Sequence, residues 1–417
     1  MKKICLFVFI FFIAMLFTAC YNPSKMNTTN ITSNYQDQSR SLNISICAYN
    51  LSSDSTRIYY KFNTGGLFFQ KDMKKNYFYA QYIIRYDLYN AADMKKVIDS
   101  ASFLIIDSVN YGTNSNLTDS IDMLLKEPDN YVVSFTIIDL NKTFSSTNYL
   151  NIYKNNLLNR NNYIIRDSKN NPIIQNYLSR SNGFRIFMRE KQVYKLFVRY
   201  YKSSTDIAEP PFAVVNLKPR SFKADSIFTI DITDRHSGTL SFSEPGIYHF
   251  QSDTSQKDGF TIFRFSDDFP LITSAQEMIG PLRYITTKSE YNDLALMKNI
   301  KAAIDNFWLD KAGNPDRAKE MIKAYYNRVQ DANRFFSSYT EGWKTDRGMI
   351  YIVYGPPYSV YRSPFNETWY YGEDRNILSM TLDFNKTLDP FTENDYTLDR
   401  SAEYKDVWYS AVETWRK

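Results

Sequence analysis

The spacing of apolar residues changes once along this chain, near Ile272, and this change constrains the fold more than any other feature. From Phe78 to Leu88 every even position is apolar, which is the period of a strand with one buried face. The same alternation recurs at Tyr131–Ile137, Tyr194–Tyr200 and Phe228–Ile232. Beyond residue 272 the apolar residues recur at helical spacing instead. A β-rich region is therefore expected to precede a region that contains helices.

The β-rich region divides into two blocks that share one short feature. Glu127–Tyr131 and Glu244–Tyr248 both place a proline turn directly before a strand that a tyrosine opens. This pattern is similar to the turn and tyrosine before a late strand of immunoglobulin-like sandwiches, although a chance match is the alternative. We therefore predict two tandem immunoglobulin-like β-sandwiches, over residues 41–155 and 156–268.

Two amphipathic helices are predicted in the C-terminal third. Thr287–Glu290 has the pattern of a capping box, and Gly313 gives a stop. The apolar face between them comprises Met297, Ile300, Ile304 and Phe307. Pro315 begins a second helix, and the short turn between the helices favours antiparallel packing. With strands expected at 349–354, 368–371 and 378–384, residues 269–417 are predicted to form an α+β domain with an antiparallel helix pair and a small antiparallel sheet.

One motif in this domain carries a family resemblance. The pentapeptide Gly342-Trp343-Lys344-Thr345-Asp346 is followed by Arg347-Gly348 and then by Gly355-Pro356-Pro357. Together with upstream and downstream segments, this pattern resembles the GWxTD domain of bacterial envelope proteins over about Phe269 to Phe384. The supporting segments are Gly280–Tyr284, Phe307-Trp308, Tyr325–Asn333 and Glu367–Tyr371. The resemblance implies a secreted or lipidated bacterial protein and implies no particular activity.

A structural interpretation explains the motif without a ligand. Gly342 and Gly348 would permit backbone angles that other residues resist. Trp343 would be a large apolar anchor in the seam between the helix pair and the sheet. Thr345 and Asp346 would bond nearby backbone amides and lock the turn.

The residues that follow extend this structural interpretation. Arg347 has three candidate ion-pair partners, namely Asp346, Glu341 and Glu367. Gly355-Pro356-Pro357 would end a strand over 349–354 abruptly, because proline lacks the amide donor that a strand ladder needs.

A functional interpretation makes the same loop a site. Asp346 would be an acid/base group or a ligand, and Arg347 would clamp an anion. Trp343 or Trp369 would be a stacking platform. Trp369 and Tyr371 alternate in a strand and share a face, which would bind a sugar or peptide if it were exposed. Packing of that face in the core is the alternative.

The N-terminus indicates where the protein is located. Met1-Lys2-Lys3, the apolar run Ile4–Phe17 and the small residues before Cys20 have the order of a secretory signal. A cysteine at that place resembles the lipobox of bacterial lipoproteins, so we expect cleavage after residue 19 and acylation of Cys20. A plain signal peptide with an incidental cysteine is the alternative.

Residues 20–40 are expected to be a flexible tether. No acidic cluster follows Cys20, and in lipoproteins of the Bacteroidetes such a cluster accompanies surface display. An outer-membrane location facing the periplasm is therefore expected.

The scarce residue types exclude several kinds of chemistry. Once Cys5 is removed and Cys20 is acylated, Cys47 is the remaining one of three cysteines, so no intrachain disulfide is possible. Cys47 lies in a strand-like run and is expected to be buried and inert. Two histidines leave little from which to build a histidine-rich metal site or a Ser-His triad. We predict no cofactor and no metal. The formal net charge is +5 without a long block of one sign, so no nucleic-acid partner is expected either.

These observations favour one function over two rivals. The leading hypothesis is a non-catalytic binding or scaffold lipoprotein of the cell envelope. Its partners would be a lipid bilayer, through acylated Cys20, and an envelope protein or glycan. One rival is a hydrolase of envelope polymers that uses carboxylates such as Asp346 and Glu367. The other is a carbohydrate-binding protein that uses Trp369 and nearby tyrosines.

Overall fold

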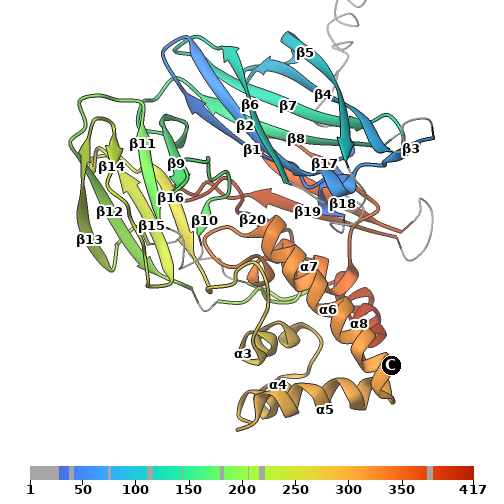
Figure 1. Cartoon of the computed structure of the whole chain (residues 1–417). Helices are drawn as coiled ribbons and strands as arrows, with labels where there is room; N and C mark the ends of the chain where they lie inside the picture. Colours follow the sequence, from blue (N-terminus) through green and yellow to red (C-terminus); the bar gives the residue numbers. More distant parts are fainter. Residues whose placement is uncertain are drawn as a thin grey trace, which may run out of the picture.

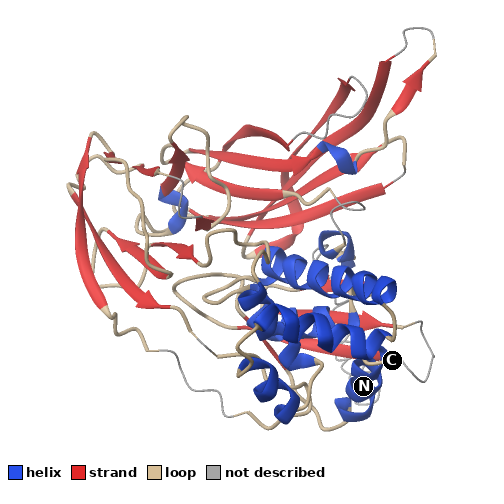
Figure 2. Cartoon of the chain, turned by 60° about the horizontal axis from the view of Figure 1, so that its bottom comes forward, coloured by secondary structure: helices blue, strands red, loops and turns tan. Residues whose placement is uncertain are grey.

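The computed structural model describes residues 28–36, 42–73, 77–109, 116–142, 144–178, 183–204, 206–215, 221–372 and 379–417. Two β-rich bodies follow each other along the chain, and a mixed helical and β body follows them (Figure 1). The long helices gather in one part of the molecule, beside the small C-terminal sheet, whereas the rest consists mainly of strands (Figure 2). Cys20 and the apolar run before it lie outside the described residues.

The first β-rich body is a sandwich of two sheets. Its strands are β1 (Ser45–Asn50), β2 (Ser55–Asn63), β3 (Gln70–Asp72), β4 (Tyr77–Asn90), β5 (Asp93–Val109), β6 (Asn116–Leu124), β7 (Asn130–Asp139) and β8 (Phe144–Tyr153). One sheet has the order β1-β2-β6 and the other the order β3-β4-β7-β8, with β5 paired to β4. Phe62 of β2 meets Tyr82 of β4 edge to face in the core between them. The even positions of β4 are buried there, as the alternation predicts.

The second β-rich body is built around one sheet that folds back on itself. Its strands are β9 (Tyr163–Asp167), β10 (Tyr177–Leu178), β11 (Phe184–Met188), β12 (Lys195–Lys202), β13 (Ser226–Thr233), β14 (His236–Ser237), β15 (Gly246–Gln251) and β16 (Phe260–Arg264). The strand order is β10-β16-β15-β12-β13-β14-β11-β9. Leu196 and Val198 of β12 are fully buried against Phe250 and Ile262, as the alternation predicts. Tyr194, at the start of the predicted run, lies outside β12 and is 73% exposed, so the prediction was wrong there.

A matching tyrosine closes a corner in each sandwich. The hydroxyl of Tyr131 donates to the carbonyl of Lys126 (3.0 Å), and that of Tyr248 donates to the carbonyl of Glu244 (2.8 Å). Both rings are buried at the start of a strand, and both hydroxyls reach back across the preceding proline turn. This is the geometry of a tyrosine corner in immunoglobulin-like sandwiches. The short match between the two blocks therefore has a structural basis.

The C-terminal body is an α+β domain. Its helices are α3 (Ala275–Ile279), α4 (Lys288–Ala295), α5 (Ile300–Ala312), α6 (Pro315–Phe336), α7 (Asp346–Tyr354) and α8 (Tyr404–Thr414), with the 3₁₀ turns η4 (Gly280–Tyr284) and η5 (Gly342–Lys344). The antiparallel sheet β17-β18-β19-β20 comprises Ser359–Arg362, Asn366–Tyr371, Met380–Lys386 and Tyr396–Leu398. The fold class predicted from the sequence, two tandem sandwiches followed by an α+β domain, is confirmed.

Two local predictions for this domain were wrong. The capping box at Thr287 forms, but its helix ends at Ala295, and α5 begins separately with Asn299 as its N-cap. Met297 is 54% exposed and does not belong to the apolar face. The strand expected at 349–354 is instead the helix α7. Its residues Met349–Val353 are buried on all sides, and for such a run periodicity does not separate a helix from a strand.

The segment expected to be a flexible tether is fixed in its described part. Residues 28–36, with the 3₁₀ turn η1 (Thr32–Tyr35), lie against the C-terminal domain and β8. The amide of Ile31 donates to the carbonyl of Val360 (2.9 Å), and the hydroxyl of Tyr351 donates to the carbonyl of Tyr35 (2.9 Å). Asn34 donates to the backbone of β8 (2.7 Å). Ile31 and Tyr35 are buried, so this segment completes the core of a domain that lies more than 200 residues later in the sequence.

We expect Tyr248→Phe to lower the free energy of unfolding by about 1 kcal/mol, because it removes the hydroxyl that closes the second corner. Tyr131→Phe should have a similar effect in the first sandwich. The matched control is Tyr194→Phe, because Tyr194 is 73% exposed and should change stability by less than about 0.5 kcal/mol. Urea denaturation followed by circular dichroism measures all three. Equal stabilities for Tyr248→Phe and Tyr194→Phe would contradict the role of the corner.

Candidate functional site

The motif loop is tied to the end of α6 by its own backbone. The amide of Gly342 donates to Ser337 Oγ (2.9 Å), and the amide of Trp343 donates to Asn333 Oδ1 (3.1 Å). Thr345 is the N-cap of α7, since its hydroxyl accepts from the amide of Gly348 (3.1 Å). The same hydroxyl donates to the carbonyl of Gly342 (2.8 Å). Thr345 therefore locks the turn, as the structural interpretation predicts.

The two motif glycines are needed for close approach rather than for unusual angles. Neither Gly342 nor Gly348 has a positive φ. A Cβ atom on Gly342 would lie 1.9 Å from the carbonyl oxygen of Ala332, and one on Gly348 would lie 1.8 Å from the carbonyl oxygen of Gly342. The expectation about backbone angles was therefore wrong. The loop packs backbone against backbone at both positions.

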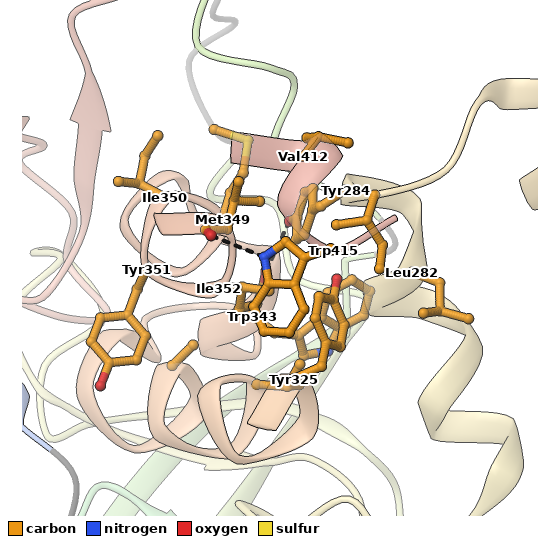
Figure 3. Close-up of a cluster of buried hydrophobic side chains, with 14 of the residues drawn as sticks. Leu282, Tyr284, Tyr325, Trp343, Met349, Ile350, Tyr351, Ile352, Val412 and Trp415 are labelled. Atoms are coloured by element: carbon orange, nitrogen blue, oxygen red, sulfur yellow. Dashed lines mark hydrogen bonds between the residues drawn. The ribbon is translucent and has the colours of Figure 1, made fainter. Parts of the chain in front are cut away.

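Trp343 packs against η4, not against the sheet. Its indole ring contacts Gly280 so closely that a Cβ there would lie 2.6 Å from the ring, and its carbonyl accepts from the Tyr284 hydroxyl (2.8 Å). The ring is 8% exposed and belongs to the cluster of buried aromatic and aliphatic side chains that also contains Tyr325 and Trp415 (Figure 3). Trp343 is thus a core anchor, but the seam that it fills joins α6 and α7 to η4.

Asp346 fastens the loop to the end of the sheet. Its carboxylate accepts from the amide of Leu398 (2.8 Å) and pairs with Arg400 (2.5 Å). Arg400 also donates to the carbonyl of Glu209, in the long connection between β12 and β13. Asp346 was expected to bond an amide close to it in sequence, but the amide that it bonds belongs to Leu398, which is distant in sequence. The side chains of Asp346 and Arg400 are both about one-tenth exposed. The carboxylate of Asp346 therefore has a structural role and is not accessible to a ligand.

Of the three candidate partners, Glu367 is the one that forms an ion pair with Arg347. Arg347 and Glu367 are both almost fully buried, and their nearest nitrogen and oxygen atoms lie 3.1 Å apart. The second carboxylate oxygen accepts from Arg362 Nε (2.6 Å) and from the Tyr35 hydroxyl (2.8 Å). Trp369 Nε1 donates to the first (3.1 Å). A single carboxylate therefore joins α7, β17, β18 and the N-terminal segment; we name these five side chains the Glu367 cluster.

The charges of the Glu367 cluster are fixed at physiological pH. Burial alone would raise the pKa of Glu367, but the guanidinium groups of Arg362 and Arg347 lower it to about 2. Burial raises the pKa of Tyr35 far above its ordinary value. A general acid or base works best with a pKa near the working pH, so neither group has the properties of one.

Trp369 and Tyr371 share the inner face of β18, as predicted, but that face is in the core. Trp369 is fully buried, and the Tyr371 hydroxyl donates to the carbonyl of Gly355 (2.8 Å). Gly355, with a φ of +86°, ends the helix α7 rather than a strand, and Pro356 and Pro357 follow it. The stacking platform proposed at Trp369 is therefore not accessible.

Cys47 and the scarce histidines give no alternative centre. Cys47 is buried, and burial raises the pKa of its thiol to about 11. His249 is buried with both ring nitrogens bonded, and burial lowers its pKa to about 4. Within the described ranges, no group of three or more histidine, cysteine, aspartate or glutamate side chains is placed to hold a metal ion.

A large hollow lies outside the motif loop, and no motif in the sequence predicts it. A cleft of about 1010 Å³ runs between the first sandwich, the start of the second and the C-terminal sheet. Its charged lining residues are Lys61, Arg160, Arg334, Arg362, Lys386 and Glu393. Among the described lining residues, one carboxylate therefore accompanies five cations. Because the lining comes from segments hundreds of residues apart, no local pattern could reveal it.

The fold and the motif define a multidomain, β-rich protein with a C-terminal α+β domain. The family model of the GWxTD domain matches residues 246–417. This part of the chain is therefore similar to the GWxTD domain. The match begins within β15, earlier than the boundary at residue 269 that the sequence suggested.

The comparisons with curated proteins and with solved structures do not indicate a function. A search of curated proteins found no match. Among solved structures, a glycosyl hydrolase family 2 member from Bacteroides cellulosilyticus has 10% identity and a TM-score of 0.19, over 34% of this chain and 18% of that one. A β-glucuronidase from Bacteroides uniformis has 12% identity and a TM-score of 0.21, over 39% and 16%. The chain thus spans less than a fifth of these proteins, and at such TM-scores the likeness carries no argument.

We expect Gly348→Ala to destabilise the protein by about 3 kcal/mol or more, because the added methyl group meets backbone that cannot move aside. The control is Gly238→Ala, since a Cβ at Gly238 would have no atom within 4 Å. Denaturant unfolding measures both. A Gly348→Ala protein as stable as Gly238→Ala would show that the loop is not packed in this way.

We expect Glu367→Gln to lower stability by about 3 to 5 kcal/mol, because two buried arginines lose their counter-charge. The folded-state pKa of Glu367 is depressed, so its contribution is present above pH ~4.5 and is lost as the pH falls toward 2. The variant should therefore lose less stability than the parent over that pH range. Asp305→Asn is the control, because its pair with Lys301 is exposed and should contribute about 1 kcal/mol or less. Equal losses from the two substitutions would contradict the role of the buried cluster.

Proposed function

We propose that this protein is a non-catalytic binding or scaffold protein of the bacterial cell envelope. It is anchored by acylated Cys20, in the outer membrane and facing the periplasm. The two sandwiches and the GWxTD domain present a cleft to an envelope partner, and the motif loop maintains the shape of that cleft.

The observation that carries this proposal is the use of the motif side chains inside the molecule. Trp343, Asp346 and Arg347 are all bonded to, or packed against, other parts of the chain. A hydrolase with two carboxylates needs both within reach of a substrate. Glu367 is fully buried, Asp346 is paired with Arg400, and Glu393 is the one carboxylate among the described residues that line the large cleft. A binding function therefore fits the geometry better than hydrolysis does.

The position of the N-terminal segment supports the anchored arrangement. Asn30 Oδ1 accepts from the amide of Val360 (3.0 Å), so the chain leaves the GWxTD domain beside β17. Asn30 lies ten positions after Cys20, and such a length of chain spans at most about 36 Å. An acylated Cys20 would therefore hold the GWxTD domain close to the bilayer. None of the helices in the described ranges is long and apolar enough to cross a membrane.

Labelling with a radioactive fatty acid tests the anchor. In cells that express the full chain, we expect label in the parent protein and none in Cys20→Ala, because the thiol and the new amine at that residue carry the lipid. Equal label in both proteins would remove the anchor from the proposal.

Site-specific photo-crosslinking tests the binding function. Leu388 lines the cleft and is 96% exposed, so a photoreactive residue there should form one discrete adduct in intact envelopes. The control position is Lys319 on α6, whose side chain is 78% exposed and does not line the cleft. Purified mature protein should also release no fragments from peptidoglycan or glycan polymers. Turnover of such a polymer, or equal adducts at the two positions, would contradict the proposal.

A further inference from the structure

A second, smaller hollow lies on the outer face of the C-terminal sheet. It has a volume of about 470 Å³, and β17 and β18 contribute most of its lining. The lining residues from this hairpin are Tyr361, Arg362, Ser363, Asn366, Thr368 and Tyr370. Trp369 and Val360 point to the opposite, buried face. The hollow therefore lies on the other face of the hairpin from Trp369 and shares only Arg362 with the Glu367 cluster.

Two tyrosine rings form the apolar part of the hollow. Tyr361 and Tyr370 lie on neighbouring strands, with ring centroids 5.8 Å apart and planes at 80°. Tyr370 is 37% exposed. A tyrosine ring offers an apolar face and, at its edge, a hydroxyl that donates and accepts. Such a pair presents one flat surface and two polar ends to a ligand.

The polar part of the hollow is held in place by bonds to the rest of the domain. Arg362 donates to Glu367 and to the Tyr35 hydroxyl, so the Glu367 cluster fixes its position. Thr368 donates to Asp383 (2.5 Å), and Ser363 donates to Asn366 (2.5 Å). Groups fixed before a ligand arrives lose little freedom when it binds.

The chemistry of the lining excludes several ligand classes. Among the described residues, no aspartate or glutamate lines the hollow, so this lining does not suit a metal ion. None of the described lining residues is aliphatic, so they do not suit an acyl chain. Arg362, the cation among them, is already paired with Glu367, so they do not suit a phosphate. Hydroxyl, amide and phenol groups remain, and they match a neutral ligand with many hydroxyl groups.

We propose that this hollow binds a neutral saccharide, with one sugar ring stacked on Tyr370 and its hydroxyl groups bonded to Thr368 and Asn366. A sugar ring has an apolar C–H face and a polar rim, which correspond to the two parts of the lining. The volume lies in the range of small-ligand sites and has room for about one or two sugar rings. This inference rests on the proposed binding function and names a ligand for it.

The N-terminal segment contributes to the same hollow. Thr28 lines it beside Tyr361, and Asn30 is bonded to the neighbouring residue Val360. The saccharide site is therefore complete only when residues 28–36 are docked. An envelope glycan bound here would lie next to the point where the chain leaves toward Cys20.

Isothermal titration calorimetry with three tetrasaccharides tests the proposal on the mature protein with Cys20→Ala. The probes are tetra-N-acetylchitotetraose, cellotetraose and maltotetraose, which separate an N-acetylated cell-wall glycan from unmodified glucans. We expect saturable binding of at least one probe, with a Kd of 1 mM or tighter. Tyr370→Ala should weaken this binding at least tenfold, while Tyr370→Phe, which keeps the ring, should weaken it less than threefold.

Tyr358→Ala is the matched control. Tyr358 adjoins the same hairpin and is 71% exposed, but it does not line the hollow, so its removal should leave the Kd unchanged. Thermal unfolding of each variant confirms that the domain is folded. Absence of saturable binding for all three probes, or equal effects of Tyr370→Ala and Tyr358→Ala, would overturn the saccharide site. The crosslinking result at Leu388 would be unaffected, so failure of this site and failure of the proposed function are distinguishable.

Discussion

A buried carboxylate organises the C-terminal domain of this protein. Glu367 accepts hydrogen bonds or ion pairs from Arg347, Arg362, Tyr35 and Trp369, and each of these belongs to a different segment or position of the fold. Removing such a charge from water is costly, and two guanidinium groups and two neutral donors offset that cost. Because every partner loses its acceptor if the carboxylate is lost, the cluster links the helix α7, the sheet and the N-terminal segment into one unit.

The buried Glu367 cluster explains why the residues of the GWxTD motif have a structural role. Arg347 can reach Glu367 because Thr345 caps the helix that carries it, and the loop reaches α6 because Gly342 and Gly348 allow backbone to touch backbone. Trp343 fills the remaining space beside Gly280, which belongs to another segment of the family resemblance. The motif therefore fixes the relative positions of η4, α6 and α7. Any ligand of the domain would therefore bind to surfaces whose positions are fixed by the packing of the motif residues.

Some features of this structure could be predicted from the sequence because they depend only on residues that are close together in the chain. Alternation in β4 and β12, the capping box at Thr287 and the tyrosine corners each depend on residues close together in the chain. The helix α7 was not predictable, since a run buried on every side has no periodicity to read. Arg347 had three plausible carboxylate partners, and only the tertiary arrangement selects Glu367. The docking of Tyr35 and the large cleft depend on segments hundreds of residues apart, for which a single sequence holds no signal.

The docked N-terminal segment changes how the domains relate to a membrane. The first sandwich is nearest to Cys20 in sequence, but residues 28–36 fasten to the GWxTD domain first, through Ile31 and Tyr35. If Cys20 carries a lipid, force on the anchor is shared between the GWxTD domain, through Ile31 and Tyr35, and the first sandwich, through Asn34. A cluster of charge-assisted hydrogen bonds inside a packed core suits that position better than a flexible tether does.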